Sequence, residues 1–596
     1  MASSVYELFL QSVDKYTTAA AVKHKQADRW VSISWRQLQQ QVESIAAGLI
    51  NLGIQPGDRV AIVANTRLEW TLTDLAIWAA GGCGVPIYHS NTPEEIAFIL
   101  QDSGAKLLFV EDEQQLQKVA SILSQTPELK VIVSYSKTDK QQLQNRQLVD
   151  WRHIQQTAPD ALLASSPHKK LQAADLATIV YTSGTTGRPR GAMITHHNLL
   201  HQGKTIEQMQ LITVNDVQLL FLPLSHIFAR FLEIAWLQTG HLLVFAENMD
   251  RVIDNMQEVN PTMMACVPRV FEKVRMRVMQ QAASAPWLKS RLIDWAVAVS
   301  AQHAQRVADG QVANLWQRLI FRLAHRLVLQ KMGAQLRERF GGNMRLFVSG
   351  GAPLSKKVGQ FFEDIGVVIC EGYGLTETTA PICFNLPNDR RVGTVGKVMP
   401  GTRLRIADDG EILARGDAIF TGYWHQSNIT DEVFSEGWLC TGDVGHIDQD
   451  GFVYITDRKK DLIVTAGGKN IAPQKVEMAV KANSSLIGHA VVYGDKKPFL
   501  TALIVLEPDA LLAWAQQKQI TGSYQQLTQH AAVRAAIQKS VTAVNQQLPR
   551  HEQIKQFAIL DHDLVVGQQL TPTLKVKRGV CYDMYKSQFD QLYQSA

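Results

Sequence analysis

The feature that most restricts the fold is a repeated alternation of helical segments with short, wholly apolar segments. Val42, Ile45 and Leu49 follow helical spacing, and Gly53 ends that helix. Continuous apolar strands between helices are typical of buried, mainly parallel sheets, so the pattern predicts an α/β fold. The other elements expected from this pattern are a second helix at 93–104 and apolar strands at 60–64, 105–110, 131–135 and 177–181.

The pattern of expected helices and strands changes twice toward the C-terminus. Residues 400–456 read as short strands joined by Asp-Gly turns, and the chain after 460 reads as a small α/β unit with strands at 489–494 and 500–506. We therefore predict a large domain over residues 1–458 and a small domain over 459–596.

Composition excludes several classes of protein. The 596 residues are 46% hydrophobic and 19% charged, as in an ordinary globular protein, and a net charge of +5 gives no reason to expect nucleic acid as a partner. The six cysteines are scattered without a Cys-x-x-Cys pair, which indicates reduced thiols in a cytoplasmic protein. The N-terminal residues lack the pattern of a signal peptide, and no run approaches 18 apolar residues.

Positive charge gathers in one predicted helical insert, at about 270–340. Residues 269–340 contain thirteen Lys or Arg and four Asp or Glu, with Trp287, Trp295 and Trp316 among them. Basic helices with Trp and Leu suit contact with anionic lipid at the inner face of a membrane. The alternative is a helical pair packed on the main domain with a solvated basic face.

A loop rich in glycine and threonine follows the strand at 177–181. Residues 181–191 hold three glycines, three threonines and one serine. Successive backbone N–H groups in such a turn form an anion site, so the loop favours phosphate over a plain surface turn. The glycine spacing fits neither a Walker A loop nor a dinucleotide fingerprint, and Tyr181 stands where a nucleophile elbow requires glycine.

Together with other motifs in order, this loop resembles the signature of the adenylate-forming enzymes, the superfamily of acyl-CoA synthetases, luciferases and peptide-synthetase adenylation domains. A further stretch, VPRVFEKV at 267–274, is similar to long-chain fatty-acid–CoA ligases. The other matching motifs are FLPLSHIFARF (221–231), SGGAPLS (349–355), EGYGLTET (371–378), GEILARG (410–416), TGYW (421–424), TGD (441–443), DRKKDLI (457–463) and LTPTLKVKR (570–578).

The resemblance implies a fold and a reaction. The large domain would contain mixed, mainly parallel sheets with helices and a distorted β-barrel, and the small α/β domain would be mobile. A fatty-acid carboxylate would attack the α-phosphate of ATP, with Mg²⁺ present, to give acyl-AMP and pyrophosphate. Coenzyme A would then displace AMP. The substrates supply both nucleophiles, so catalysis would rest on positioning and charge stabilisation.

The resemblance also implies a residue for each part of the nucleotide. Thr182 and Glu377 would lie near Mg²⁺, Tyr373 would stack on adenine, and Asp443 and Arg458 would bind the ribose. The other residues implied to contact ATP or AMP are Ser183, Gly184, Thr185, Thr186, Gly187, Gly350, Gly351, Ala352, Pro353, Glu371, Gly372, Gly374 and Thr376.

Lys575 is implied to bridge the carboxylate and the α-phosphate, where one compact cation lowers the repulsion between two anions. Lys460 is implied to be the hinge, and the Gly467-Gly468 segment is implied to border the pantetheine arm of coenzyme A. His226 would border the acyl carboxylate at the mouth of the acyl tunnel.

Two arginines depart from the pattern of the family. Arg230 stands at or near the aromatic gate of some long-chain relatives, so at the tunnel it would handle an anion instead. Arg190 replaces the usual lysine of the loop, and its planar fork suits two phosphate oxygens. A surface role is the alternative for Arg190.

Two other functions compete with a fatty-acid–CoA ligase. One is a fatty-acyl-AMP ligase that loads a carrier protein, and the other is a non-catalytic nucleotide-binding relative. The stretch at 267–274 favours coenzyme A as acceptor, and the presence of Glu377, Asp443, Arg458 and Lys575 favours catalysis. Acyl chain length and oligomeric state do not follow from the sequence.

Overall fold

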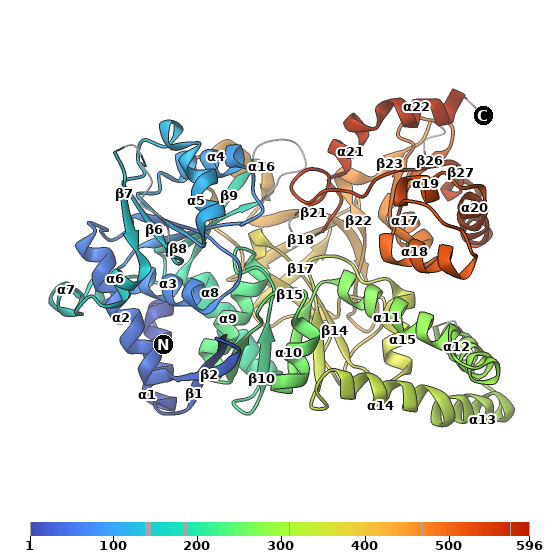
Figure 1. The fold of residues 1–596 in the computed structure, drawn as a ribbon, viewed down its shortest axis with the longest axis horizontal. Helices are drawn as coiled ribbons and strands as arrows, with labels where there is room; N and C mark the ends of the chain where they lie inside the picture. The colour runs from blue at the N-terminus through green and yellow to red at the C-terminus, as the bar shows by residue number, and fades with distance from the viewer. Residues whose placement is uncertain are drawn as a thin grey trace.

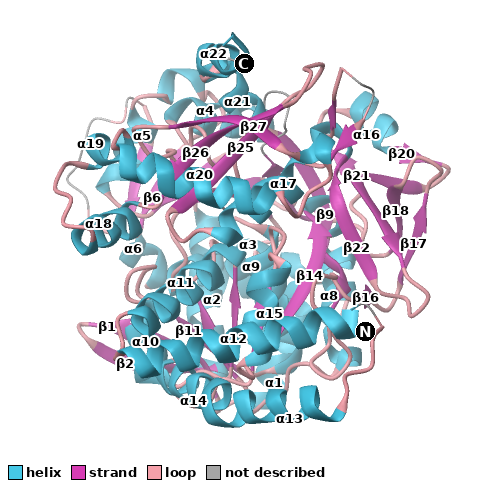
Figure 2. Ribbon diagram, turned by 90° about the vertical axis from the view of Figure 1, so that its right-hand side faces the viewer, coloured by secondary structure: helices cyan, strands magenta, loops and turns pink. Residues whose placement is uncertain are grey.

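A computed structural model describes residues 2–137, 143, 145–182, 189–308, 310–466, 469–571 and 574–594. Two large sheets and their covering helices form the body of the chain, and a small C-terminal unit lies beside it (Figure 1). Helices lie between and around the strands, as expected for an α/β protein (Figure 2).

The nine-stranded sheet carries much of the candidate site. Its order is β16-β15-β14-β13-β12-β10-β11-β1-β2, and the run from β14 to β1 is parallel. Its strands are β1 (Ala20–Gln26), β2 (Arg29–Ser34), β10 (Val217–Leu220), β11 (Leu242–Phe245), β12 (Met263–Cys266), β13 (Leu346–Ser349), β14 (Ile369–Leu375), β15 (Ala380–Phe384) and β16 (Lys397–Val398).

The eight-stranded sheet has the order β19-β9-β8-β4-β3-β5-β6-β7. It is parallel from β8 to β7, and β9 returns antiparallel to β8. Its strands are β3 (Arg59–Val63), β4 (Cys83–Ile87), β5 (Leu107–Val110), β6 (Val131–Ser134), β7 (Gln147–Asp150), β8 (Leu176–Thr182), β9 (Arg190–Thr195) and β19 (Gly422–Tyr423).

Smaller sheets make up the rest. The short strands expected at 400–456 form a five-stranded antiparallel sheet: β17 (Thr402–Ile406), β18 (Glu411–Gly416), β20 (Phe434–Ser435), β21 (Trp438–Ile447) and β22 (Val453–Arg458). The small unit holds the pair β23 (Ile463–Val464) and β24 (Asn470–Ile471) and the three-stranded sheet of β25 (Ile487–Tyr493), β26 (Leu500–Leu506) and β27 (Ile554–Ile559).

Local sequence explains where several helices begin and end. Thr92 and Glu95 form a capping box at the start of the helix at 93–103, and Gly104 ends it with φ of 61°. The helices of the large domain are α1 (Val5–Tyr16), α2 (Trp35–Asn51), α3 (Leu68–Ala79), α4 (Pro93–Ser103), α5 (Glu113–Ala120), α6 (Trp151–Gln155), α7 (Asp160–Ser165), α8 (His196–Met209), α9 (Ile227–Thr239), α10 (Val252–Val259), α11 (Pro268–Ala283), α12 (Trp287–Ala308), α13 (Leu315–Ala324), α14 (Gln330–Arg339), α15 (Lys356–Asp364) and α16 (Ser427–Val433). Those of the small unit are α17 (Pro473–Asn483), α18 (Pro508–Gln517), α19 (Tyr524–Thr528), α20 (Ala531–Asn545), α21 (Arg578–Met584) and α22 (Lys586–Gln594).

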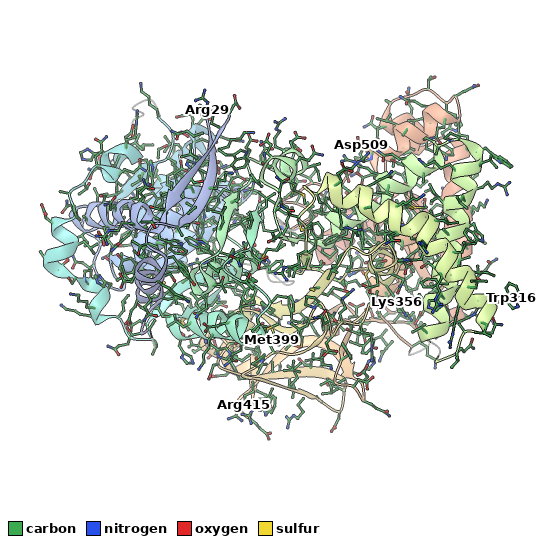
Figure 3. The ribbon with its side chains drawn as sticks, turned by 90° about the horizontal axis from the view of Figure 1, so that it is seen from below. Arg29, Trp316, Lys356, Met399, Arg415 and Asp509 are labelled. Atoms are coloured by element: carbon green, nitrogen blue, oxygen red, sulfur yellow. The ribbon has the colours of Figure 1, made fainter. Side chains whose placement is uncertain are left out.

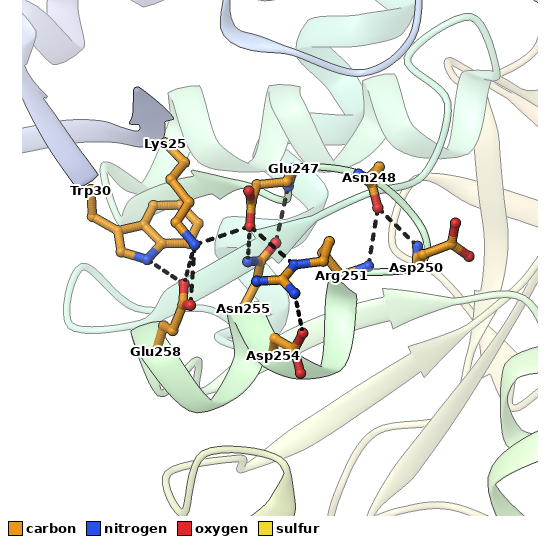
Figure 4. Close-up of polar contacts among 9 residues, drawn as sticks. All are labelled: Lys25, Trp30, Glu247, Asn248, Asp250, Arg251, Asp254, Asn255 and Glu258. Atoms are coloured by element: carbon orange, nitrogen blue, oxygen red, sulfur yellow. Dashed lines mark hydrogen bonds and ion pairs between the residues drawn. The ribbon is translucent and has the colours of Figure 1, made fainter. Parts of the chain in front are cut away.

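A polar network fastens the β1–β2 hairpin at the edge of the nine-stranded sheet (Figure 4). The Lys25 ammonium pairs with Glu247 at 3.1 Å and with Glu258 at 2.9 Å, and the Trp30 indole N–H donates to Glu258 at 2.7 Å. The Asn255 amide donates to Glu247 at 2.7 Å. An edge hairpin leaves backbone groups unpaired on one side, so contacts from α10 help to hold it.

The predicted elements are confirmed. The alternation in the first part of the chain appears as α2, β3, α4, β5 and β6, and the later strands appear as β25 and β26. The insert is helical throughout α11 to α14, apart from short connections. Among the described residues, no helix is both long enough and apolar enough to cross a membrane.

Candidate active site

The predicted adenine platform lies where two parallel strands end side by side. Ser349 at the end of β13 pairs with Glu371 in β14, so the loop from Gly350 to Pro353 leaves the sheet beside the strand that carries Tyr373. A side chain at Gly374 would overlap the carbonyl of Ala380. The glycine therefore permits the close approach of β14 and β15 that shapes this edge.

Three other members of the predicted set flank this platform. Gly372 and Thr376 lie on either side of Gly374, and burial raises the pKa of Glu371 to about 8. Glu371 is therefore protonated near neutral pH and adds no charge beside a bound base. The loop residues Gly351 and Ala352 lie at the same strand end, with Gly351 at φ of 77°.

Tyr373, Asp443 and Arg458 form one connected group. The buried Tyr373 hydroxyl donates to Asp443 Oδ2 at 2.7 Å. Arg458 Nε lies 3.1 Å from Asp443 Oδ1, because the two residues are direct partners across β21 and β22. Burial opposes the charge of Arg458, but Asp443 and Glu377 outweigh it and raise the pKa of this guanidinium. Strand pairing thus brings Arg458 to Asp443, and the Tyr373 hydroxyl joins them from another sheet.

Lys575 of the small unit reaches this group. Burial and then Arg458 lower the pKa of Lys575 to about 8, while Asp443 acts in the opposite direction. The residue as a whole is exposed. Its own loop is closed by a hydrogen bond from the Lys575 N–H to the Thr571 hydroxyl, at 3.0 Å. A cation from one domain therefore faces the acidic and basic groups of the other.

His226 immediately precedes α9 and is influenced by the charge of Lys575. Its Nδ1 accepts a hydrogen bond from the Phe228 N–H at 3.1 Å and caps the helix. Burial and then the charge of Lys575 lower the pKa of His226 to about 4. The ring is therefore neutral near pH 7, with its proton on Nε2, and it can donate one hydrogen bond to an anion.

The predicted Mg²⁺ residues belong to a second group, at the end of β8. Thr182 pairs with Arg190 across β8 and β9, and the Arg190 guanidinium lies 5.7 Å from the centre of the Tyr423 ring. The Tyr423 hydroxyl donates to Glu377 Oε1 at 2.7 Å. The described residues contain no cluster of three His, Cys, Asp or Glu side chains suited to a metal. One carboxylate and one hydroxyl fit Mg²⁺ that takes its other ligands from phosphate and water.

Arg230, predicted at the acyl tunnel, has its side chain buried among groups of the protein itself. Its side chain is 1% exposed, and it pairs with Asp74 at 2.6 Å and donates to the Thr178 hydroxyl at 2.9 Å. The rings of Trp70 and Trp78 lie 5.4 Å from its guanidinium carbon. One turn after His226, the helix faces the interior, so Arg230 binds an anion of the protein itself.

Some predicted residues fall outside this geometry. Ser183, Gly184, Thr185, Thr186 and Gly187 lie outside the described residues, as do Gly467 and Gly468. Lys460 is exposed in the short turn after β22, and its neighbour Lys459 pairs with Glu411 at 2.7 Å.

Sequence reasoning missed Tyr423 as a site residue. The TGYW motif was the available signal, since it belongs to the set that resembles the adenylate-forming enzymes. Its tyrosine links Glu377 to Arg190, and burial followed by the charge of Glu377 raises the pKa of this phenol far above its ordinary value. Tyr423 thus remains a hydroxyl donor that orients the Glu377 carboxylate.

Comparison with known proteins shows the family of this chain. The AMP-binding enzyme family matches residues 9–424, and the AMP-binding enzyme C-terminal domain matches residues 460–596. This chain belongs to the AMP-binding enzyme family. It is 38% identical to the long-chain-fatty-acid–CoA ligase FadD15 of Mycobacterium bovis, over 95% of this chain and 92% of that protein. It is 34% identical to the long-chain-fatty-acid–CoA ligase ACSBG2 of Xenopus laevis, over 100% of this chain and 84% of that protein.

Solved structures share the fold of this family member. The adenylation domain of a carboxylate reductase from Mycobacterium chelonae superposes with a TM-score of 0.77 at 21% identity, covering 99% of this chain and 91% of that one. At this identity the likeness concerns the fold, which is α/β with a large domain of mixed sheets followed by a smaller C-terminal domain.

Proposed function

We propose that this member of the family is a long-chain fatty-acid–CoA ligase. It activates a fatty acid with ATP to acyl-AMP, releases pyrophosphate, and transfers the acyl group to coenzyme A. The observation that carries the proposal is the electrostatic influence of Asp443 and Arg458 on Lys575 of the small domain, and of Lys575 on His226. Near full-length similarity to enzymes named long-chain-fatty-acid–CoA ligases supports the substrate class.

Each side chain has a task in the first half-reaction. Tyr373 and the loop from Gly350 flank the adenine, while Asp443 accepts the ribose hydroxyls beside Arg458. Lys575 attracts both the carboxylate and the α-phosphate and reduces their repulsion as they approach. Neutral His226 donates a hydrogen bond from Nε2 that orients the fatty-acid carboxylate.

The group at the end of β8 would bind the pyrophosphate end of ATP. Thr182 and Glu377 would hold Mg²⁺, which supplies positive charge to the phosphates when it is bound. Arg190 offers a planar pair of donors for phosphate oxygens, in a position fixed over the Tyr423 ring. Replacing Arg190 with lysine should change pyrophosphate release or the affinity for ATP, and unchanged kinetics would leave Arg190 without a role.

We place the domain boundary between residues 458 and 459, with Lys460 as the hinge. Movement about this point would withdraw Lys575 after acyl-AMP forms and let coenzyme A enter beside Gly467 and Gly468. The Asp457 carboxylate accepts a hydrogen bond from the Gln474 N–H at 3.1 Å, so the hinge begins in a strand that is tied to α17.

A chain-length series tests the function. Purified protein is supplied with ATP, Mg²⁺ and fatty acids from octanoate to octadecanoate, with and without coenzyme A, and AMP and acyl-CoA are measured. We expect AMP release that depends on both coenzyme A and a long chain. Acyl-AMP accumulation that only a carrier protein relieves would favour the carrier-loading alternative, and no turnover would refute the enzyme.

The surface of α12 and α13 supports a second part of the proposal, which is contact with an anionic membrane. Trp287 is 69% exposed and Trp316 is 73% exposed, and Figure 3 shows Trp316 pointing away from the body of the protein. Exposed patches of this kind mark interaction sites. The other exposed apolar side chains of this surface are Leu288, Leu292, Val307, Val312, Leu315, Leu319, Ile320, Leu323 and Leu327.

Charge supports an anionic membrane as the partner of this surface. Lys289, Arg291, Arg318, Arg322 and Arg326 accompany the apolar side chains, and the opposite face of α12 packs on the domain through Ile293 and Ala296. Apolar side chains flanked by basic ones suit a headgroup layer that is itself anionic. A fatty acid dissolved in the bilayer would then be delivered near the enzyme.

Vesicle pelleting separates the two readings of this surface. We expect binding to vesicles containing phosphatidylglycerol that salt weakens, and Trp316→Ala with Leu315→Ala should reduce it about tenfold. Met584→Ala, at an exposed position of α21, serves as the matched control. Equal binding of both variants, or no binding of the wild type, would contradict membrane contact and favour the alternative of a solvated basic face.

A further inference from the structure

An ionic contact joins α11 of the large domain to the small domain. Arg269 pairs with Glu507, and Lys273 approaches the same carboxylate at 3.7 Å. Lys481 of α17 pairs with Glu272 of α11 at 3.1 Å. Opposite charges therefore cross the domain boundary in both directions, along one face of a single helix.

This contact is partly shielded from water. The side chain of Arg269 is 18% exposed and that of Glu507 is 9% exposed. Arg269 also donates to the carbonyl of Gly488 at 3.2 Å, and Met276, two turns further along α11, packs against the apolar core of the small domain. Several shared charges in a partly desolvated place contribute more than isolated pairs on the surface.

The contact exists in the arrangement that puts Lys575 in the active site. A second link, Lys577 to Glu95 at 3.9 Å, lies two residues from Lys575. The α11 contact is distant in sequence from Lys575 and from every residue assigned above to ATP. Any rotation that withdraws Lys575 must move the small domain relative to α11, so it must break or rearrange these pairs.

We infer that Arg269 and Glu507 are positioning residues that hold Lys575 in place for the adenylation half-reaction. The inference rests on the proposed function and adds a role for α11 to it. Arg269 is the most connected member, because it bonds both the Glu507 carboxylate and the Gly488 carbonyl across the boundary. Burial and then Lys481, Arg269 and Lys273 lower the pKa of the neighbouring His489 to about 3, so this ring adds no positive charge to the contact.

The two half-reactions, measured separately, test this role. In Arg269→Ala, pyrophosphate release from ATP and hexadecanoate should slow by about tenfold, which corresponds to about 1.4 kcal/mol. Thioester formation from preformed acyl-AMP and coenzyme A should be unchanged or faster, because that step does not need Lys575. A purely structural defect would slow both half-reactions alike.

Two further variants and a control keep the test decisive. Lys481→Ala removes the Glu272 pair and should give a smaller loss in the same half-reaction. Arg269→Lys keeps a cation facing Glu507 and should retain more of the adenylation rate than Arg269→Ala. Lys475→Ala breaks the pair with Glu552, at 2.9 Å within the small domain, and should change neither half-reaction.

The outcomes distinguish the inference from the function on which it rests. A wild type that releases no pyrophosphate with fatty acids refutes the proposed function. An active wild type with unchanged adenylation in Arg269→Ala, or with equal loss in both half-reactions, refutes the positioning role alone.

Discussion

Replacement of Arg230 by methionine tests the buried cluster that replaced the expected tunnel contact. The variant keeps an unbranched apolar side chain but removes the ion pair with Asp74 and the hydrogen bond to Thr178, two contacts of 2.6 and 2.9 Å in a place that water does not reach. It leaves the carboxylate of Asp74, which is 0% exposed, without its cation.

The magnitude follows from the cost of an uncompensated charge. Breaking one partner of a buried pair destabilises a protein by about 3–5 kcal/mol. Burial raises the pKa of Asp74 to about 6 even with Arg230 present, so the variant can reduce the loss by protonating this carboxyl. Protonation becomes costlier as pH rises, hence the deficit in unfolding free energy should be larger at pH 8 than at pH 6.

The assay is thermal unfolding of the purified protein at both pH values. A loss of this size should lower the melting temperature of the large domain by roughly 3–5 °C, since an unfolding entropy of about 2.1 cal/mol/K per residue, summed over residues 1–458, gives about 1 °C per kcal/mol. Arg415→Met, at an exposed position of β18, should stay close to the wild type. Asp74→Asn combined with Arg230→Met should recover part of the loss. An unchanged melting temperature with an altered chain-length preference would refute the structural role and restore the tunnel contact.

Three shorter predictions concern single groups. Burial and then Asp74 raise the pKa of Glu233 to about 8 from 4.5, so folding favours its protonated form and the free energy of unfolding falls as pH rises across that interval. Glu233→Gln should therefore gain stability relative to the wild type between pH 5 and pH 8. A stability difference that stays constant with pH would contradict this prediction. Because Lys575 must be charged, kcat/KM for adenylation should fall above pH 8, whereas Lys575→Arg should remain flat there; parallel profiles would argue against the lysine as the titrating group. Tyr423→Phe removes the donor to Glu377 and should raise the Mg²⁺ concentration needed for half-maximal activity by about tenfold. An unchanged midpoint in a Mg²⁺ titration would contradict this prediction.

The order of local elements could be predicted from the sequence because it depends on neighbouring residues. Helical spacing around Val42 to Leu49, the Gly104 stop and the apolar run at 60–64 each carry their own signal. The order of strands in the sheets could not be predicted in this way. The β1 strand pairs with β11, more than two hundred residues later, and no local pattern encodes that partner.

The candidate site divides in the same way. Lys575, Asp443 and Arg458 could be named from motifs, but the pairing of Asp443 with Arg458 follows from the register of β21 and β22. Arg230 shows the limit of motif position. It lies four residues after His226 in one motif, yet His226 is the extended cap residue before α9, whereas Arg230 lies inside the helix and is buried in the core.

The most direct test of the account is the Lys575→Ala enzyme, assayed in its two half-reactions. The account predicts that fatty-acid-dependent pyrophosphate release falls by on the order of a hundredfold or more, since the cation between two anions is lost. It also predicts that transfer of a preformed acyl-AMP to coenzyme A continues at close to the wild-type rate. Equal loss of both half-reactions, or adenylation that survives without Lys575, would contradict it.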